Sequence, residues 1–430
     1  MKISVSKYKI IIFIIIFIAI ITRIIFVNKS DIGLFQYDMG LYNRLNNEED
    51  YDNVYEELYN EDMGPSHINY IMYLYTYNKL PPTDEIRGQL YHPPLHHFIM
   101  ATWLKVADLF SDVSSVKLES LQYTIIVYSI VILIALYKIL KELEVDDKYK
   151  IVPMLLFAFY PLCTYLSGTI NNDELVTMFC ILSFLYILKW GKEQSYKNAI
   201  LSAAFIGFGL MTKTSAFVMM IPAMYIFFKK SDEYVMTEKS LKKLILHMII
   251  FGIIVIILGG WFHVLNRLQT ITIYPPKESL RVTTDNLWDR FGISSLLTSN
   301  KYNVWNYLLY SSLSFDVFSN ENMIIKELVV LAFILILDSL YYSFKYFKEN
   351  LLINITILSW IIFYIYLQIS LPYECSMHAR YMIVPMSLGI TLLGRGMQKE
   401  KNKVIKYQII ITTVCIAFLG IRLILGNWGP

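Results

Sequence analysis

Charged residues and cysteines are both scarce in this chain of 430 residues. Charged side chains make up 17% and hydrophobic ones 56%, a balance that soluble domains of this length do not show. The four cysteines lie in or beside apolar runs without CxxC spacing, which argues against a disulfide framework or a zinc site. The formal net charge is only +3, and we expect no nucleic-acid partner. The composition predicts a membrane protein.

Apolar runs recur along the whole chain and predict an all-α polytopic membrane protein with about eleven transmembrane helices. Several runs are shorter than the ~20 residues that cross a bilayer, but flanking Tyr, Trp and Lys extend them. The first run follows a basic start and no small-residue cleavage site follows it, so we interpret it as a retained signal anchor. We expect one membrane-embedded domain over 1–430, with spans at 10–27, 123–140, 151–166, 175–188, 199–211, 215–228, 244–261, 328–344, 351–371, 381–393 and 407–425.

Lysine and arginine mark every second connection between these runs. With Met1 in the cytoplasm, the connections expected inside carry the basic residues and the alternate ones are poor in them, as the positive-inside rule requires. The C-terminal Pro430 is then outside, and we expect a multi-pass protein of the plasma membrane. The connections expected inside contain Lys138, Lys141, Lys148, Lys150, Lys189, Lys192, Lys197, Lys229, Lys230, Lys239, Lys242, Lys243, Lys345, Lys348, Arg395, Lys399, Lys401, Lys403 and Lys406.

Two of the outer connections are long, at 28–120 and 262–326. The apolar stretch 95–110 within the first would reverse the lysine pattern if it spanned the membrane, so we expect amphipathic helices on the membrane surface there. Long ordered loops are usually functional. We find no internal repeat, whereas secondary transporters often have matched halves. The layout favours an enzyme whose active face is extracytoplasmic.

The first long loop closes on the segment Tyr91-His92-Pro93-Pro94-Leu95-His96-His97. Two prolines fix φ and remove two backbone donors, so the chain turns before a helix begins. Imidazoles at a membrane surface point to an anion, a metal or a proton. A metal pair of His92 and His96 needs a helix that already includes His92, which the prolines oppose. We therefore favour anion contact by His92 and His96, and expect no metal.

Three further positions have both a structural and a functional interpretation. Asp38, in an aromatic setting after the first run, fits either the N-cap of a helix starting at Met39 or a base that accepts a proton from an alcohol. Asn172 and Asp173 fit a helix cap or a binding rim. Lys213 is the one cation in an apolar turn, and it either snorkels to headgroups or balances a phosphate.

Arginine occurs near the outer end of three apolar runs. Arg380 opens the tenth run, where its guanidinium suits bidentate phosphate contacts. Arg23 and Arg422 each stand alone, and snorkelling to the headgroups explains both.

Taken together, these residues resemble the GT-C class of membrane glycosyltransferases, specifically the family of the protein O-mannosyltransferases and the lipid A aminoarabinose transferase. An acid follows the first span with a tyrosine four positions later, and a cation-Pro-Pro-Leu segment closes the first loop. An Asn-Asp turn and then a Thr-Lys turn follow on the same face. The residues that carry this likeness are Asp38, Tyr42, His92, Pro93, Pro94, Leu95, Asn172, Asp173, Thr212 and Lys213.

The resemblance implies inverting transfer of a sugar from a polyprenyl-phosphate donor to a glycan, lipid or protein acceptor, without a cofactor. It implies that Asp38 is the general base and that Tyr42, His92, His96, Asn172, Asp173, Lys213 and Arg380 bind substrate. The chain departs from the family in two places. The aminoarabinose transferases have Glu-Lys before Pro-Pro where this chain has Tyr91-His92, and the mannosyltransferases have a second acid where Met39 stands. The alternative is a flippase or transporter of a lipid-linked or anionic substrate, although polar residues at mid-span are few.

Overall fold

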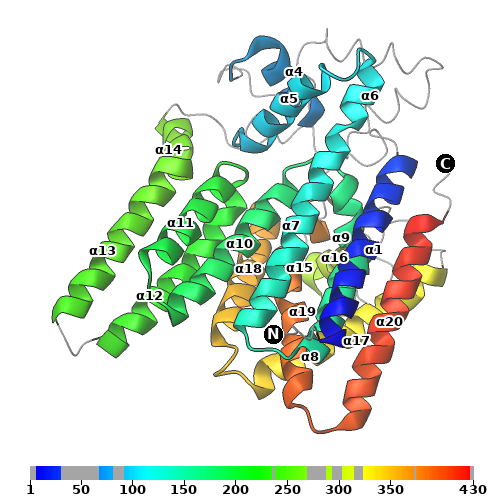
Figure 1. Ribbon diagram of the computed structural model, residues 1–430, viewed down its shortest axis with the longest axis vertical. Coiled ribbons are helices and arrows are strands. Elements are labelled where there is room, and N and C mark those ends of the chain that lie inside the picture. The colour runs from blue at the N-terminus through cyan, green and yellow to red at the C-terminus, as the bar shows by residue number, and fades with distance from the viewer. Residues whose placement is uncertain are drawn as a thin grey trace, which may run out of the picture.

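The computed structural model describes residues 6–30, 67–80, 92–234, 238–268, 287–292, 303–313, 323–371 and 374–426. Every regular element in these residues is helical. The long helices pack side by side into a bundle (Figure 1). They are α1 (Lys7–Lys29), α7 (Leu121–Glu142), α8 (Asp147–Phe159), α10 (Asp173–Lys192), α11 (Tyr196–Leu210), α12 (Met220–Tyr234), α13 (Glu238–Val255), α17 (Met323–Lys345), α18 (Leu351–Ser370), α19 (Ile383–Lys399) and α20 (Lys403–Leu425).

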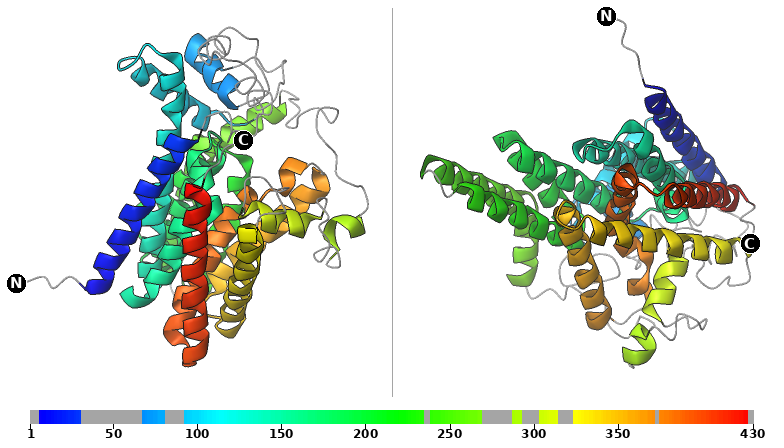
Figure 2. Two further views of the ribbon diagram at one scale, coloured as in Figure 1. Left: turned by 90° about the vertical axis from the view of Figure 1, so that its right-hand side faces the viewer. Right: turned by 90° about the horizontal axis from the view of Figure 1, so that it is seen from below.

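Shorter helices cap or continue the long ones. Three of them, α4, α5 and α6, gather at one end of the bundle, called the α5 end from here on (Figure 1). The helix α1 begins at the opposite end of the bundle and ends at the α5 end. The helix α20 runs in the same direction (Figures 1 and 2). The short elements are α4 (His67–Tyr77), α5 (Leu95–Ala107), α6 (Ser114–Glu119), α9 (Pro161–Tyr165), η2 (Leu166–Gly168), η3 (Thr214–Met219), η4 (Ile256–Gly260), α14 (Trp261–Leu268), α15 (Leu287–Phe291), α16 (Val304–Ser311), η7 (Glu374–Met377) and η8 (Ala379–Met382).

Six helices among the described residues are long and apolar enough to cross a membrane. The pair α8 and α9 counts as a seventh if it is one span bent by 59°. The prediction of a polytopic all-α membrane protein is therefore confirmed in its coarse form. Each of the eleven predicted apolar runs lies on helical elements of the structure. The helix α5, which we expected on the membrane surface, is not among the candidate spans.

Ion pairs join the connections at the end of the bundle opposite α5. Lys192 lies 3.7 Å from Glu142, which links the connection after α7 to the connection after α10. Lys345 donates to Glu400 at 2.7 Å, which links the end of α17 to the end of α19. Basic residues therefore gather at this end, and some of them pair with acids of neighbouring connections. We call it the lysine-rich end.

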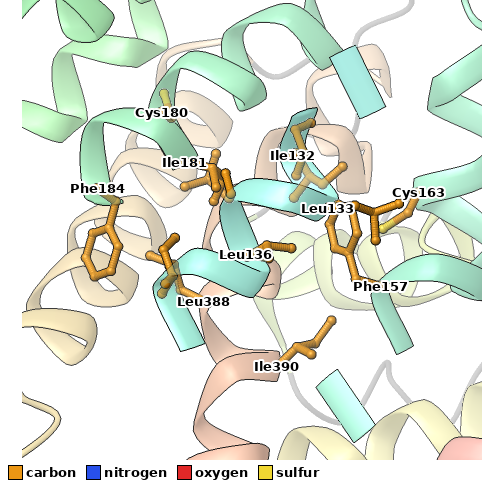
Figure 3. Close-up of a cluster of buried hydrophobic side chains, with 14 of the residues drawn as sticks. Ile132, Leu133, Leu136, Phe157, Cys163, Cys180, Ile181, Phe184, Leu388 and Ile390 are labelled. Atoms are coloured by element: carbon orange, nitrogen blue, oxygen red, sulfur yellow. The ribbon is translucent and has the colours of Figure 1, made fainter. Parts of the chain in front are cut away.

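The core lies between α7, α8, α10 and α19. Figure 3 shows side chains from α7 between residues of α8 and α9 on one side and residues of α10 on the other. Burial of such apolar side chains from four helices holds the bundle together. The labelled residues are Ile132, Leu133, Leu136, Phe157, Cys163, Cys180, Ile181, Phe184, Leu388 and Ile390. At the edge of the bundle, Gly259 lets η4 approach α11, because a Cβ there would collide with the Gly207 carbonyl oxygen.

Candidate active site

The N-terminus of α10 presents a buried carboxylate at the α5 end. The backbone N–H of Asp173 donates to Asn171 Oδ1 at 2.9 Å, so Asn171 satisfies the first N–H of the helix. Asn172 occupies the N-cap position, as one interpretation of the sequence had it, but its side chain makes no capping bond and donates to the carbonyl oxygen of Thr212 at 3.2 Å. Asp173 is the first residue of the helix, and its carboxylate is available for other partners.

Two cations from distant segments meet at the Asp173 carboxylate. Lys213 donates from Nζ to Oδ1, and Nε of Arg380 lies 3.5 Å from Oδ2. The aromatic ring of Tyr381 lies under both cations, with its centroid 4.5 Å from Lys213 Nζ and 5.2 Å from Arg380 Cζ. Lys213 is 6% exposed, so it does not snorkel to headgroups. Two cations from distant segments thus meet at one buried carboxylate.

The segment that contains Arg380 is held by side chains that the sequence did not point to. The N–H of Arg380 donates to His378 Nδ1 at 3.1 Å, and the N–H of Ala379 donates to Ser311 Oγ at 2.9 Å. Burial, and next the nearby charge of Arg380, lower the pKa of His378 to about 3. His378 is therefore neutral at pH 7 and serves as an acceptor that positions Arg380.

Four imidazoles cluster beside this charged centre. His67, at the start of α4, lies 2.9 Å from His97 across their ring nitrogens Nδ1 and Nε2. Its ring stacks over His92 with centroids 5.7 Å apart, and His96 meets it edge-on at 6.2 Å. The N–H of Leu95 donates to the carbonyl oxygen of Met211 at 2.9 Å, which ties the first turn of α5 to the turn before Lys213. No sequence signal marked His67, because a single histidine in a polar loop is unremarkable.

Burial keeps the histidine cluster neutral. Loss of hydration, and next the positive charge of Lys213, lower the pKa of His92 well below its usual range. Burial lowers the pKa of His96 to about 3, and the attraction of Asp173 offsets only part of that effect. The expectation that His92 is a cation was therefore wrong. Its imidazole offers hydrogen bonds instead of charge.

Two predicted residues, Asp38 and Tyr42, lie outside the described residues. Within the part of the chain that the structure describes, no group of three or more His, Cys, Asp or Glu side chains is arranged to hold a metal ion.

Part of this chain matches the sequence model of a known protein family. Residues 91–261 match the sequence model of the family described as dolichyl-phosphate-mannose-protein mannosyltransferase. Over these residues the chain is similar to that family of membrane glycosyltransferases. The matched region of the mannosyltransferase family contains His92, His96, Asn172, Asp173 and Lys213, whereas Asp38, Tyr42 and Arg380 lie outside it. A search of curated proteins found no match.

Three solved structures are similar at low identity. ArnT from Cupriavidus metallidurans in the apo state is 12% identical, with a TM-score of 0.49, over 81% of this chain and 57% of that one. The Archaeoglobus fulgidus oligosaccharyltransferase with Zn and sulfate is 14% identical, with a TM-score of 0.45, over 79% and 45%. The oligosaccharyltransferase AglB of the same organism, with an inhibitory peptide and a dolichol-phosphate, is 11% identical, with a TM-score of 0.47, over 79% and 48%. The chain thus spans about half the length of these proteins, and we transfer no residue role from them.

Proposed function

We propose that this protein transfers a sugar from a polyprenyl-phosphate donor to an envelope acceptor, with inversion, at the outer face of the plasma membrane. The observation that carries the proposal is the pairing of Lys213 and Arg380 with the single carboxylate of Asp173. A donor phosphodiester has one negative charge, which two neighbouring cations can hold and can stabilise on the leaving group. The matched mannosyltransferase family supports a lipid-phosphate sugar as the donor.

Each described site residue has a role in this proposal. Lys213 and Arg380 hold the phosphate and stabilise it as it leaves, and Asp173 fixes both cations in place. Asn172 holds the turn before Lys213 through the Thr212 carbonyl. His92 and His96 are neutral and buried, so they offer donors and acceptors to the donor sugar or phosphate without further charge.

Asp38 is the general base in this scheme, and Tyr42 contacts the substrate beside it. The acceptor hydroxyl oxygen attacks the anomeric carbon, and Asp38 takes the hydroxyl proton. The bond from the anomeric carbon to the phosphate oxygen breaks, and polyprenyl phosphate leaves with the electron pair. Two observations support the assignment. The helix α1 ends at the α5 end (Figure 1), and nine residues from Lys29 to Asp38 reach at most about 32 Å.

We further propose eleven membrane crossings, with the α5 end outside. The eleven apolar runs all lie on helices, and ion-paired lysines gather at the opposite end of the bundle. Under the positive-inside rule, that lysine-rich end is cytoplasmic. The long connections 28–120 and 262–326 are then the two outer loops.

The variant Asp38→Asn tests this function. The amide keeps the shape and any capping bond but removes basicity. We expect purified Asp38→Asn to bind polyprenyl phosphate normally and to release it from a polyprenyl-phosphate sugar about 10²–10⁴-fold more slowly. Mass analysis compares the envelope glycans of cells that carry the wild-type protein with those of cells that carry Asp38→Asn. The glycan lost in the variant is the product. The exposed Asp112 provides the matched control, and Asp112→Asn should leave turnover unchanged.

Two outcomes would count against the proposal. A folded Asp38→Asn protein with normal turnover would show that Asp38 is not the base. Movement of intact lipid-linked sugar across vesicles, without release of polyprenyl phosphate, would indicate a flippase instead.

A further inference from the structure

A buried arginine lies in the first span, where the sequence led us to expect a snorkelling one. Arg23 is the one charged residue of α1 between Lys9 and Lys29. Its side chain is 0% exposed, so it does not reach the headgroups and the snorkelling interpretation was wrong. Arg422, near the end of α20, is exposed and fits that interpretation. An intramembrane cation is costly and needs partners.

Arg23 hydrogen bonds to three other helices. Its Nε donates to Ser129 Oγ of α7 at 2.9 Å. One Nη1 bond goes to the carbonyl oxygen of Ala158 in α8 at 2.9 Å, and Nη2 lies 3.4 Å from the carbonyl oxygen of Cys163 in α9. Nη1 also lies 3.2 Å from the carbonyl oxygen of Ala19 in its own helix. The guanidinium therefore bridges α1, α7 and the two halves of the bent pair.

The bend between α8 and α9 explains why carbonyl oxygens are available to Arg23. Tyr160 is extended, with φ −65° and ψ 129°, and Pro161 begins the next helix without an N–H. In a continuous helix the N–H of Leu162 would donate to Ala158, but here it donates to the carbonyl oxygen of Ser312 at 3.3 Å. The Ala158 carbonyl oxygen loses its helical donor, and Arg23 replaces it. Backbone groups at membrane depth need such replacement partners.

The same bend connects to the segment of Arg380. The Tyr160 hydroxyl and Ser312 Oγ lie 3.0 Å apart. Ser311 Oγ, one residue earlier, accepts from the N–H of Ala379 at 2.9 Å, and Arg380 follows directly. On the other face, Gly420 lets α20 approach the bend, because a Cβ there would collide with the Phe159 carbonyl oxygen. The bend is therefore a junction between α1, α20 and the residues that hold Arg380.

We infer that Arg23 is a positioning residue for the phosphate-binding centre, an inference that rests on the proposed function. It bonds the backbone carbonyl oxygens at the bend between α8 and α9 and so fixes the position of the Arg380 segment, which contacts the same bend. A displacement of about 1 Å at such a site costs up to about 10²-fold. The protein therefore needs a guanidinium here, because an ammonium group does not present the planar fork that bonds several acceptors at fixed angles.

The test compares Arg23→Lys with Arg422→Lys in full-length purified protein. The dissociation constant for polyprenyl phosphate, the KM for a polyprenyl-phosphate sugar and the melting temperature are measured for each. For Arg23→Lys we expect the dissociation constant and the KM to rise together by about 10-fold or more. The melting temperature should also fall, because a lysine leaves some of these buried acceptors without a donor, so affinity is measured on the folded protein. Arg422→Lys should match the wild type in all three. Ser129→Ala, which removes one acceptor of Arg23, should shift affinity in the same direction by less.

Every outcome of this test is informative. Unchanged affinity of both Arg23→Lys and Ser129→Ala would overturn the inference, and so would a fall in melting temperature with unchanged affinity of the folded fraction. If Arg23→Lys does not fold, Ser129→Ala decides alone. A wild type that binds polyprenyl phosphate without transferring sugar would refute the proposed function and leave the affinity test of Arg23 intact. A wild type that binds no polyprenyl phosphate would refute both.

Discussion

At the scale of single residues, the charged centre is defined by three side chains. Asp173 accepts from Lys213, and its Oδ2 lies 3.5 Å from Nε of Arg380. Buried charges are costly unless they are paired, and the carboxylate holds the two cations close together. Two cations held side by side are suited to binding a phosphate.

Replacement of Lys213 tests its role in phosphate binding. Lys213→Met keeps much of the side-chain length but removes the ammonium group, so we expect weaker binding of polyprenyl phosphate. A charge-assisted hydrogen bond contributes about 1.5–3 kcal/mol, which corresponds to a rise in the dissociation constant of about 10-fold to 10²-fold. The exposed Lys403 at the lysine-rich end is the control, and Lys403→Met should bind normally. Equal affinity of Lys213→Met and the wild type would leave Lys213 as a structural partner of Asp173.

Some of these residues were predictable from the sequence and others were not. Lys213 and Asp173 stood out because each is a charge in a turn between apolar runs. Asn171 did not stand out, since any of three neighbouring polar residues could accept from the first N–H groups of α10 and only the geometry shows that Asn171 does. The burial of Arg23 was unpredictable because it depends on carbonyl oxygens that a break in another helix leaves without donors.

At the scale of elements, α4 and α5 join through side chains that carry no charge. His67 begins α4, and His96 and His97 lie in the first turn of α5. All three are buried, and the ring of Tyr70 stacks on that of His97 with centroids 4.1 Å apart. The sequence predicted the histidine segment on α5 but not its partner on α4. Sequence periodicity predicts each helix by itself, but it does not predict which residues of two separate helices pack together.

This histidine cluster should make the stability of the protein depend on pH. Burial lowers the pKa of His96 from 6.5 to about 3 in the folded protein, so the unfolded chain binds the proton more readily. Stability is then complete above pH 6.5 and falls as the pH is lowered from 6.5 towards 3. Each unit of pH across this window costs about 1.4 kcal/mol for one such group, which lowers the melting temperature of a chain of this length by on the order of 1–2 °C.

The measurement compares melting temperatures at pH 7.5 and pH 5.5 for the wild type and His96→Gln. The glutamine retains polar groups but does not titrate, so the variant should lose less stability between the two values. At pH 7.5 the difference between the two proteins serves as the reference for any packing effect. Parallel losses in both proteins would mean that acid destabilises the molecule elsewhere.

At the scale of the whole molecule, two ends of one bundle have different chemistry. At the lysine-rich end some cations pair with acids, as Lys345 does with Glu400. The α5 end gathers Lys213, Arg380 and four neutral imidazoles around one carboxylate. The sequence predicted this polarity from the alternation of basic connections, because insertion places lysines on one side. It did not predict that α8 and α9 bend by 59°, since Pro161 indicates a break but not its angle.

The polarity leads to a prediction about topology. If the lysine-rich end is cytoplasmic, then the connection after α12 lies inside and the long connection 262–326 lies outside. A fluorescent reporter fused after Lys230 should fold and fluoresce, whereas one exported after Thr284 should not. Alkaline phosphatase, which is active only outside, should give the reverse pattern. The two fusions are separated by the single predicted span 244–261, so they must report opposite sides. If both reported the same side, α13 would not cross the membrane, and the alternation that places the phosphate centre at the outer face would fail with it.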